Sequence, residues 1–178
     1  GAILKRSAAD PTLFEATGRA VVFTSLEDLA ERIDAEDLDV KADDILVLQN
    51  AGPKSPSGMP EAGYIPIPKK LAQAGVKDMI RISDCRMSGT AFGTIVLHVT
   101  PEAAVGGAIG LVKNGDEIRL SIANKTLELL VDNAELKRRR QANPPQPATP
   151  TRGYAKLYAD HVTQADQGAD FDFLMAQD

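Results

Sequence analysis

Short apolar runs recur along the chain and predict strands rather than long helices. Ile45 to Leu48 is a continuous apolar run, which is typical of a strand buried on both faces. Ile80 and Ile82 alternate with polar residues, which predicts a strand that ends at Ser83 and delivers the chain into a loop. The same signals predict strands over residues 18–23, 94–99, 109–112, 118–122 and 126–131.

Helix signals lie between and after these strands. Ser25, followed three residues later by Asp28, forms a capping pattern in front of an amphipathic stretch. Asp132 is the expected cap of a helix that runs through Arg140. Two more helices are predicted over residues 69–74 and in the tail, where one helical face carries Tyr154, Leu157, Tyr158 and His161. Strands interleaved with helices indicate a mixed α/β domain.

Turn and breaker residues mark the connections. Residues 49–66 are rich in Gly, Pro and Ser and are predicted as a long loop, a feature that is usually functional or disordered in a compact domain. A second loop, Asp84 to Thr90, follows the strand that ends at Ser83. Asn114-Gly115 predicts the turn of a β-hairpin between residues 109–112 and 118–122. Pro144 to Pro150 is expected to be an extended linker.

Composition narrows the class of protein. A chain of 178 residues with 43% apolar content holds one sizeable core. The net charge of −5 and the lack of a concentrated basic face argue against binding to nucleic acid. The one basic run, Lys137 to Arg140, lies at the end of a predicted helix, where positive charge complements the helix dipole. Because no apolar stretch approaches the roughly 20 residues of a membrane span, and no signal-peptide pattern opens the chain, we expect a soluble, cytoplasmic protein with no membrane partner.

The polar loops contain the candidate catalytic and metal-binding residues. Ser88 and Thr90 flank a glycine in one tight turn, which either bonds its own backbone or lets a ligand approach the two hydroxyls. Glu61 follows a proline that stiffens its loop, so its carboxylate is either a solvated charge or a ligand for a hard cation. His98 is interpreted as a structural histidine. Cys85 is the single cysteine, which excludes an internal disulfide and any multi-cysteine metal site within this chain.

Four motifs lie on these loops and their flanks: GPxxxxGMPE, PIPKKL, RISDxRMSGT and HVTPEAAVGG. Together, from about Gly18 to Leu174, they resemble the C-terminal domain of the dihydroxy-acid and 6-phosphogluconate dehydratase family. The forms GMPEAGYIPIPKKLA and RMSGTAFGTIVLHV are more similar to the sugar-acid dehydratases of that family than to its branched-chain amino-acid enzymes.

The resemblance implies a fold and a domain plan. The fold would be a swivelling β/β/α barrel-like domain with flanking helices. Residues 1–17 would lead in from a missing N-terminal domain, residues 18–143 would form the swivelling domain, and residues 144–178 would be a linker and tail that pack on it. The opening Gly-Ala-Ile-Leu has no methionine, so we expect the chain to be cut from a longer polypeptide.

The resemblance also implies a reaction and its residues. Family members remove water from a 2,3-dihydroxy acid to give a 2-keto acid, with magnesium on the substrate carboxylate and 2-hydroxyl and an iron–sulfur cluster acting on the 3-hydroxyl. By motif position, Glu61 would be a magnesium ligand and Ser88 the base, acting as an alkoxide. Thr90 would hydrogen-bond the alkoxide or the substrate. Arg86 would add positive potential or form a surface ion pair, and His161 is a secondary substrate-binding candidate.

Cofactors and partners follow from the same resemblance. The cluster cysteines would lie in the N-terminal domain, and Cys85, where the family more often has Gly or Ala, is interpreted as a small buried residue. The full-length enzyme would be a homodimer or homotetramer, and the isolated chain is expected to be inactive. Two alternatives stay open: a dihydroxy-acid dehydratase of branched-chain amino-acid synthesis, and a non-enzymatic module that binds an anion through Ser88 and Thr90.

Overall fold

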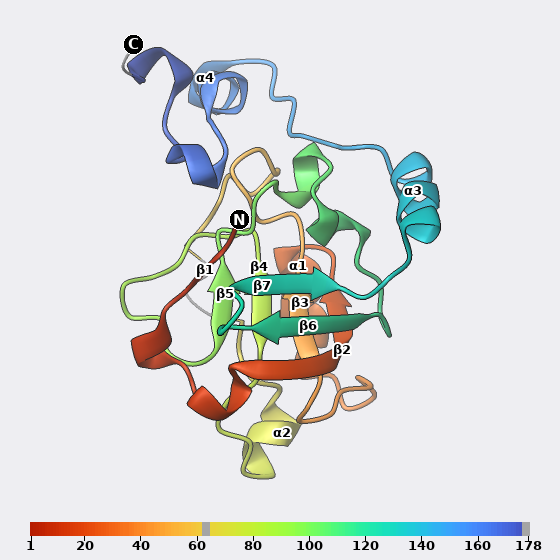
Figure 1. Ribbon diagram of the computed structural model, residues 1–178. Helices are drawn as coiled ribbons and strands as arrows, with labels where there is room; N and C mark the ends of the chain where they lie inside the picture. The colour runs from red at the N-terminus through yellow and green to blue at the C-terminus, as the bar shows by residue number, and fades with distance from the viewer. Residues whose placement is uncertain (62–64, 176–178) are drawn as a thin grey trace.

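The computed structural model describes residues 1–61 and 65–175. Within them the chain forms a seven-stranded mixed sheet in the order β1-β5-β4-β3-β2-β6-β7 (Figure 1). Strands β2 to β5 run parallel to one another, while β1, β6 and β7 run antiparallel to their neighbours. The strands are β1 Ile3–Leu4, β2 Glu15–Phe23, β3 Ile45–Leu48, β4 Arg81–Ser83, β5 Ile95–Leu97, β6 Glu117–Ser121 and β7 Thr126–Leu129.

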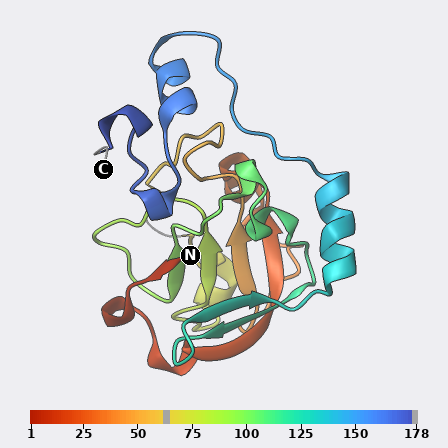
Figure 2. The ribbon, with the colours of Figure 1, turned by 45° about the horizontal axis from the view of Figure 1, so that its top comes forward.

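The sheet curls because β2 takes part in two ladders. Residues 15–19 of β2 pair with β6, and residues 20–23 pair with β3. Gly18 lies where the two ladders meet, and a Cβ there would lie 2.5 Å from the carbonyl oxygen of Asp43, so only glycine fits. The β6–β7 hairpin therefore crosses in front of the parallel strands and the sheet forms a curled half-barrel (Figures 1 and 2). The expected α/β, barrel-like fold is confirmed.

Alternate residues of the parallel strands fill two cores, one on each face of the sheet. On one face, Val21, Phe23, Leu46 and Leu48 pack with α1 and the long loops. On the other face, Ala20, Val22, Ile45 and Val47 pack with the β6–β7 hairpin. This arrangement explains why β3 is apolar throughout. The α-helices are α1 Leu26–Arg32, α2 Lys69–Gln73, α3 Asn133–Ala142 and α4 Gly153–His161, and no helix in the described residues is long and apolar enough to cross a membrane.

The predicted helix caps are confirmed. The Ser25 side chain accepts a hydrogen bond from the backbone N–H of Asp28 at 3.2 Å, which starts α1. The Asp132 carboxylate accepts from the N–H of Glu135 at 2.9 Å and starts α3. The expected strands over residues 18–23, 45–48, 80–83, 94–99 and 126–131 all correspond to strands of the sheet, with shifted ends.

The predicted hairpin is wrong. Residues 108–111 form a 3-10 helix, and the hairpin that exists joins β6 to β7. Asn114 Oδ1 accepts from the N–H of Val22 at 2.6 Å, and the N–H of Gly115 donates to the carbonyl of Ala20 at 2.9 Å. The Asn-Gly turn therefore docks on β2 instead of closing a hairpin. A four-residue apolar run has too few positions to distinguish a buried strand from a buried helical turn.

One member of the basic run has a structural role. Arg139 is buried, and its guanidinium contacts Asp116 Oδ1 at 2.9 Å and Glu135 Oε1 at 2.7 Å. Burial alone would raise the pKa of Asp116, but the hydrogen bonds from Arg139, the hydrogen bond from the N–H of Lys113 and the charges of both side chains together lower that pKa. Asp116 precedes β6, so this ion pair fixes α3 against the start of the hairpin.

Candidate functional site

The carboxyl ends of parallel strands β3, β4 and β5 meet at one edge of the sheet, where three loops emerge. These are residues 49–61, 84–92 and 98–102, and they contain four of the five candidate residues. Figure 1 shows this edge at the top of the parallel strands, below α4. Ligand sites of open α/β sheets usually lie at such an edge.

Asp84 holds the three loops together. It is fully buried directly after β4, where its Oδ1 accepts from the N–H of Ala51 at 2.9 Å and its Oδ2 accepts from the N–H of Ala103 at 2.8 Å. Burial raises the pKa of Asp84, although these N–H bonds act to lower it. The interpretation of the sequence missed this residue. A carboxylate immediately after a buried strand was the available signal.

Arg86 joins the loop that carries Ser88 to the loop that carries Glu61. The N–H of Arg86 donates to the carbonyl of Pro60 at 3.4 Å, and Arg86 Nη2 lies 3.4 Å from Glu61 Oε2. The side chains of Arg86 and Glu61 are 51% and 46% exposed, so this is a surface ion pair, of the kind that contributes about 0–1 kcal/mol. It leaves the Glu61 carboxylate accessible at the edge where the loops meet.

Ser88 and Thr90 form the tight turn that the sequence predicts. Their hydroxyl oxygens lie 3.1 Å apart, and the N–H of Thr90 donates to Ser88 Oγ at 3.3 Å. Lys5 Nζ donates to the carbonyl of Gly89 at 2.8 Å and brings a cation to the same turn. Ser88 Oγ is thus placed to accept two hydrogen bonds from Thr90, which favours negative charge on that oxygen.

His98 holds the backbone of the turn of Ser88 and Thr90 through a hydrogen bond to the residue before it. Its Nε2 accepts from the N–H of Met87 at 2.9 Å, so the ring nitrogen that faces the loop carries no proton. Burial and, to a smaller extent, the Arg86 charge lower the pKa of His98, which keeps the ring neutral. Because Met87 directly precedes Ser88, His98 acts as the support of the loop. This agrees with its interpretation as a structural histidine.

His161 is the candidate that the structure places apart from these contacts. It ends α4, where its Nδ1 lies 2.9 Å from Asp172 Oδ1 and its ring meets Phe173 edge-on at 5.0 Å. The helix itself does approach the site, since the Tyr158 hydroxyl donates to the carbonyl of Gly58 at 3.3 Å. The substrate-binding role of His161 therefore stays a prediction.

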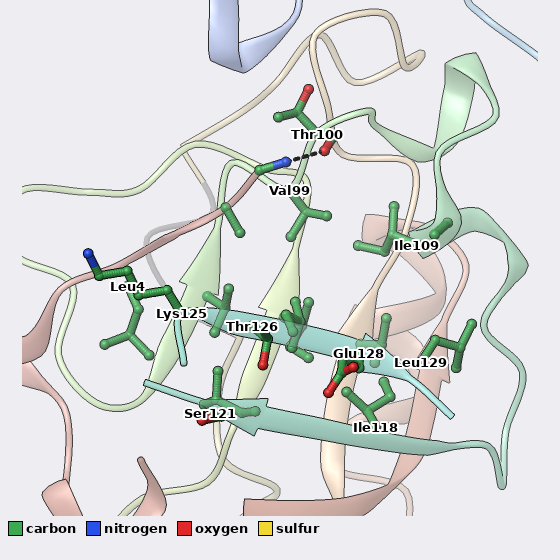
Figure 3. A pocket seen from close by; sticks show the side chains of 18 of the residues that line it. Leu4, Val99, Thr100, Ile109, Ile118, Ser121, Lys125, Thr126, Glu128 and Leu129 are labelled. Carbon is green, nitrogen blue, oxygen red and sulfur yellow. Dashed lines mark hydrogen bonds between the residues drawn. The ribbon is translucent and has the colours of Figure 1, made fainter. Parts of the chain in front are cut away.

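A cavity of about 520 Å³ lies inside the half-barrel, between the parallel strands and the β6–β7 hairpin. Figure 3 shows its mostly apolar walls, with Leu4 and Lys125 at one end and Ile118 and Leu129 at the other. None of the five candidate residues lines it. Its walls belong to the core on the hairpin face, whereas Met87, in the loop of Ser88, packs against the opposite core. The candidate catalytic and metal-binding residues therefore lie at the strand ends and not in this cavity.

The described residues offer single metal ligands rather than a complete centre. In residues 1–61 and 65–175, no group of three or more His, Cys, Asp or Glu side chains is arranged to hold a metal ion. The exposed carboxylate of Glu61 fits magnesium as one oxygen ligand, with further ligands needed from outside these residues. Cys85 is buried, as expected, and burial raises the pKa of its thiol to about 11.

We expect the Cys85 thiol to resist alkylation in the folded protein. A pKa of about 11 instead of 9.0 leaves roughly 100-fold less thiolate near neutral pH, before the loss of access through burial is added. Iodoacetamide labelling at pH 8, followed at the Cys85 peptide by mass spectrometry with and without guanidinium, measures the effect. Equal labelling rates in the folded and unfolded protein would contradict the burial of this side chain.

Comparison with known proteins gives a consistent set of relatives. Residues 1–169 match the family model of the dihydroxy-acid/6-phosphogluconate dehydratase C-terminal domain. The chain is 54% identical over 176 residues to a 6-deoxy-6-sulfo-D-gluconate dehydratase of Pseudomonas putida, with 99% of the chain and 30% of that protein covered. It is 50% identical over 174 residues to an L-arabinonate dehydratase of Rhizobium leguminosarum bv. trifolii, with 98% of the chain and 30% of that protein covered. It is 42% identical over 169 residues to a dihydroxy-acid dehydratase of Syntrophobacter fumaroxidans, with 95% and 30% covered. The chain thus spans about 30% of the length of these curated relatives.

Proposed function

The chain belongs to the dihydroxy-acid/6-phosphogluconate dehydratase family, and from that premise we propose that it is the C-terminal part of a sugar-acid dehydratase. The complete enzyme would convert a 2,3-dihydroxy sugar acid to a 2-keto-3-deoxy acid. The observation that carries this proposal is the gradient of similarity. Identity is 50–54% to relatives named as dehydratases of sugar acids and 41–42% to those named as dihydroxy-acid dehydratases.

In the proposed mechanism Ser88 removes the proton from C2 of the substrate. The electron pair left on C2 forms the C2–C3 double bond of an enol as the 3-hydroxyl departs with its own bonding electrons. The departing hydroxide takes the proton that Ser88 removed from C2 and leaves as water, which restores the Ser88 alkoxide, and the enol then tautomerises to the 2-keto acid. The hydroxyl and the N–H of Thr90 support this role because both lie within hydrogen-bond reach of Ser88 Oγ and stabilise charge there.

Glu61 is proposed as the ligand that this chain contributes to magnesium. When bound, magnesium would stabilise the negative charge that develops on the substrate carboxylate. The contacts of Arg86 with Pro60 and Glu61 support the proposal, because they bring the carboxylate to the loop of Ser88. The chain has one cysteine, so its residues do not fit an iron–sulfur cluster, and the ligands of that group would come from the N-terminal domain.

The proposed partners are an N-terminal domain, a second copy of the chain and the sugar acid. The N-terminal domain would supply the remaining magnesium ligands and the cluster, which agrees with the 30% share of the relatives that the chain covers. The complete enzyme would be a cytoplasmic homodimer or homotetramer. Its active site would lie where the loops at the carboxyl ends of β3 and β4 face the other domain.

Turnover of a substrate panel by the complete polypeptide tests the proposal. With magnesium and a reconstituted cluster, we expect kcat/KM for five- and six-carbon aldonates to exceed that for a branched 2,3-dihydroxy acid, with formation of 2-keto acid as the assay. Turnover of the branched acid alone would support the branched-chain enzyme, and no turnover of either class would support the anion-binding module. The isolated chain of 178 residues is expected to be inactive; a 2-keto acid formed by it would contradict the proposed division of the site.

A further inference from the structure

A fully buried carboxylate lies beside the loop that carries Glu61. Glu102 is 0% exposed, and its carboxylate accepts from the N–H of Lys54, at 2.8 Å to Oε1 and 3.0 Å to Oε2. Gln164, in the tail, both donates a hydrogen bond to Glu102 and accepts one from it. Gln164 Nε2 donates to Glu102 Oε1 at 2.6 Å, and the N–H of Glu102 donates to Gln164 Oε1 at 3.1 Å.

The loop closes around this carboxylate. A Cβ on Gly52 would lie 2.3 Å from Glu102 Oε2, so the backbone can approach the carboxylate only where a glycine stands. The carbonyl of Gly52 also accepts from the N–H of Met59 at 2.9 Å, which ties the two ends of the loop together. Because Met59 stands two residues before Glu61, a shift of the backbone at Gly52 moves the segment that positions the Glu61 carboxylate.

The tail contacts the same loop at three further points. The N–H of Ala148 donates to the carbonyl of Lys54 at 2.8 Å, and Lys54 Nζ donates to the carbonyl of Ala159 at 3.3 Å. The Tyr158 hydroxyl donates to the carbonyl of Gly58 at 3.3 Å. Figures 1 and 2 show α4 lying against this loop. Each of these three contacts joins the tail to a residue of the loop that lies more than 90 positions earlier in the chain.

We propose that Glu102 is a positioning residue of the dehydratase site, which fastens the tail to the loop of residues 52–61 through Gln164 and thereby fixes Glu61. The inference rests on the proposed function, in which Glu61 binds magnesium. Residues outside the immediate site that hold a metal ligand commonly change metal affinity by about 10–100-fold when they are replaced. Stabilisation of the core alone would predict that Glu102 affects unfolding and leaves the metal affinity unchanged.

The test compares Glu102→Gln, Gln164→Glu and their combination in the complete polypeptide. In Glu102→Gln the new NH2 group faces donors, so we expect the backbone amides of residues 54, 55 and 57–59 to exchange hydrogen about 10-fold faster and the apparent Kd for Mg²⁺ to rise about 10-fold. The double variant exchanges the acid and the amide and restores a donor for every acceptor. It is therefore expected to recover both readouts, which general destabilisation would not allow.

Asp116→Asn is the matched control. It breaks the ion pair between Asp116 and the buried Arg139, which joins the start of β6 to α3, so it is expected to lower the stability without changing the loop exchange or the Mg²⁺ titration. Unchanged loop exchange and Mg²⁺ affinity in Glu102→Gln would overturn the proposal. Faster loop exchange with unchanged Mg²⁺ affinity would also overturn it, provided that Glu61→Gln weakens Mg²⁺ binding. If Glu61→Gln binds Mg²⁺ normally, the proposed function itself fails.

Discussion

Replacement of Ser88 by alanine is expected to lower kcat of the complete enzyme by about 10³-fold, with little change in KM or in thermal stability. Loss of a positioned base commonly costs 10²–10⁴-fold. The Ser88 hydroxyl is hydrogen-bonded to Thr90 within the turn, and the backbone bond from the N–H of Ala91 to the carbonyl of Ser88, at 3.1 Å, does not depend on the side chain. The turn is therefore expected to persist in Ser88→Ala.

Thr90→Val gives the graded comparison for this prediction. It removes the hydroxyl that lies 3.1 Å from Ser88 Oγ but keeps the N–H that donates to the same oxygen. A loss of one of two donors is expected to cost about 10-fold in kcat, less than the loss of the base itself. Steady-state kinetics on the preferred aldonate, with circular dichroism as the test of folding, measures both variants. Full turnover by a folded Ser88→Ala enzyme would show that another group is the base.

Sequence patterns predicted the parts of the fold that depend on residues close together in the chain. The caps at Ser25 and Asp132 act over three residues, and the apolar run of β3 reports burial on both faces directly. The prediction of a hairpin over residues 109–122 was wrong for two reasons. An apolar run such as residues 108–111 suits a buried strand and a buried 3-10 helix equally, and the Asn-Gly turn is held by β2, about 90 residues earlier. Contacts of that range leave no local periodicity.

In the candidate site, too, the sequence predicted the residues of local motifs but not those defined by distant contacts. Motif order placed Glu61, Arg86, Ser88 and Thr90 on two loops, and the structure brings those loops together at Arg86. The buried carboxylates that hold the loops were not predicted. Asp84 directly follows a predicted strand, which is a signal in the sequence, whereas Glu102 is an ordinary acidic residue there. Their full burial and their bonds to distant N–H groups become visible only in the structure. The helical face of the tail predicted α4 but could not show that His161 contacts Asp172.

Replacement of Glu61 by glutamine is expected to raise the apparent Kd for Mg²⁺ at least about 100-fold, because loss of a metal ligand costs more than the loss of an outer-shell partner. At a fixed low Mg²⁺ concentration the activity would fall in proportion. Glutamine keeps the shape of the side chain but loses the charge that a hard cation prefers. The cost in stability is expected to be small, since the side chain is 46% exposed and forms one surface ion pair.

Glu128→Gln is the matched control, because Glu128 forms a surface ion pair with Arg119 in which the two side chains are 45% and 51% exposed, almost as in the pair of Glu61 and Arg86. Both variants remove one exposed carboxylate from an arginine, so screening and net charge change equally. Only Glu61→Gln is expected to shift the Mg²⁺ titration, measured by calorimetry and by the Mg²⁺ dependence of kcat. An equal response of the two variants would mean that Glu61 acts through its charge at a distance and not as a ligand.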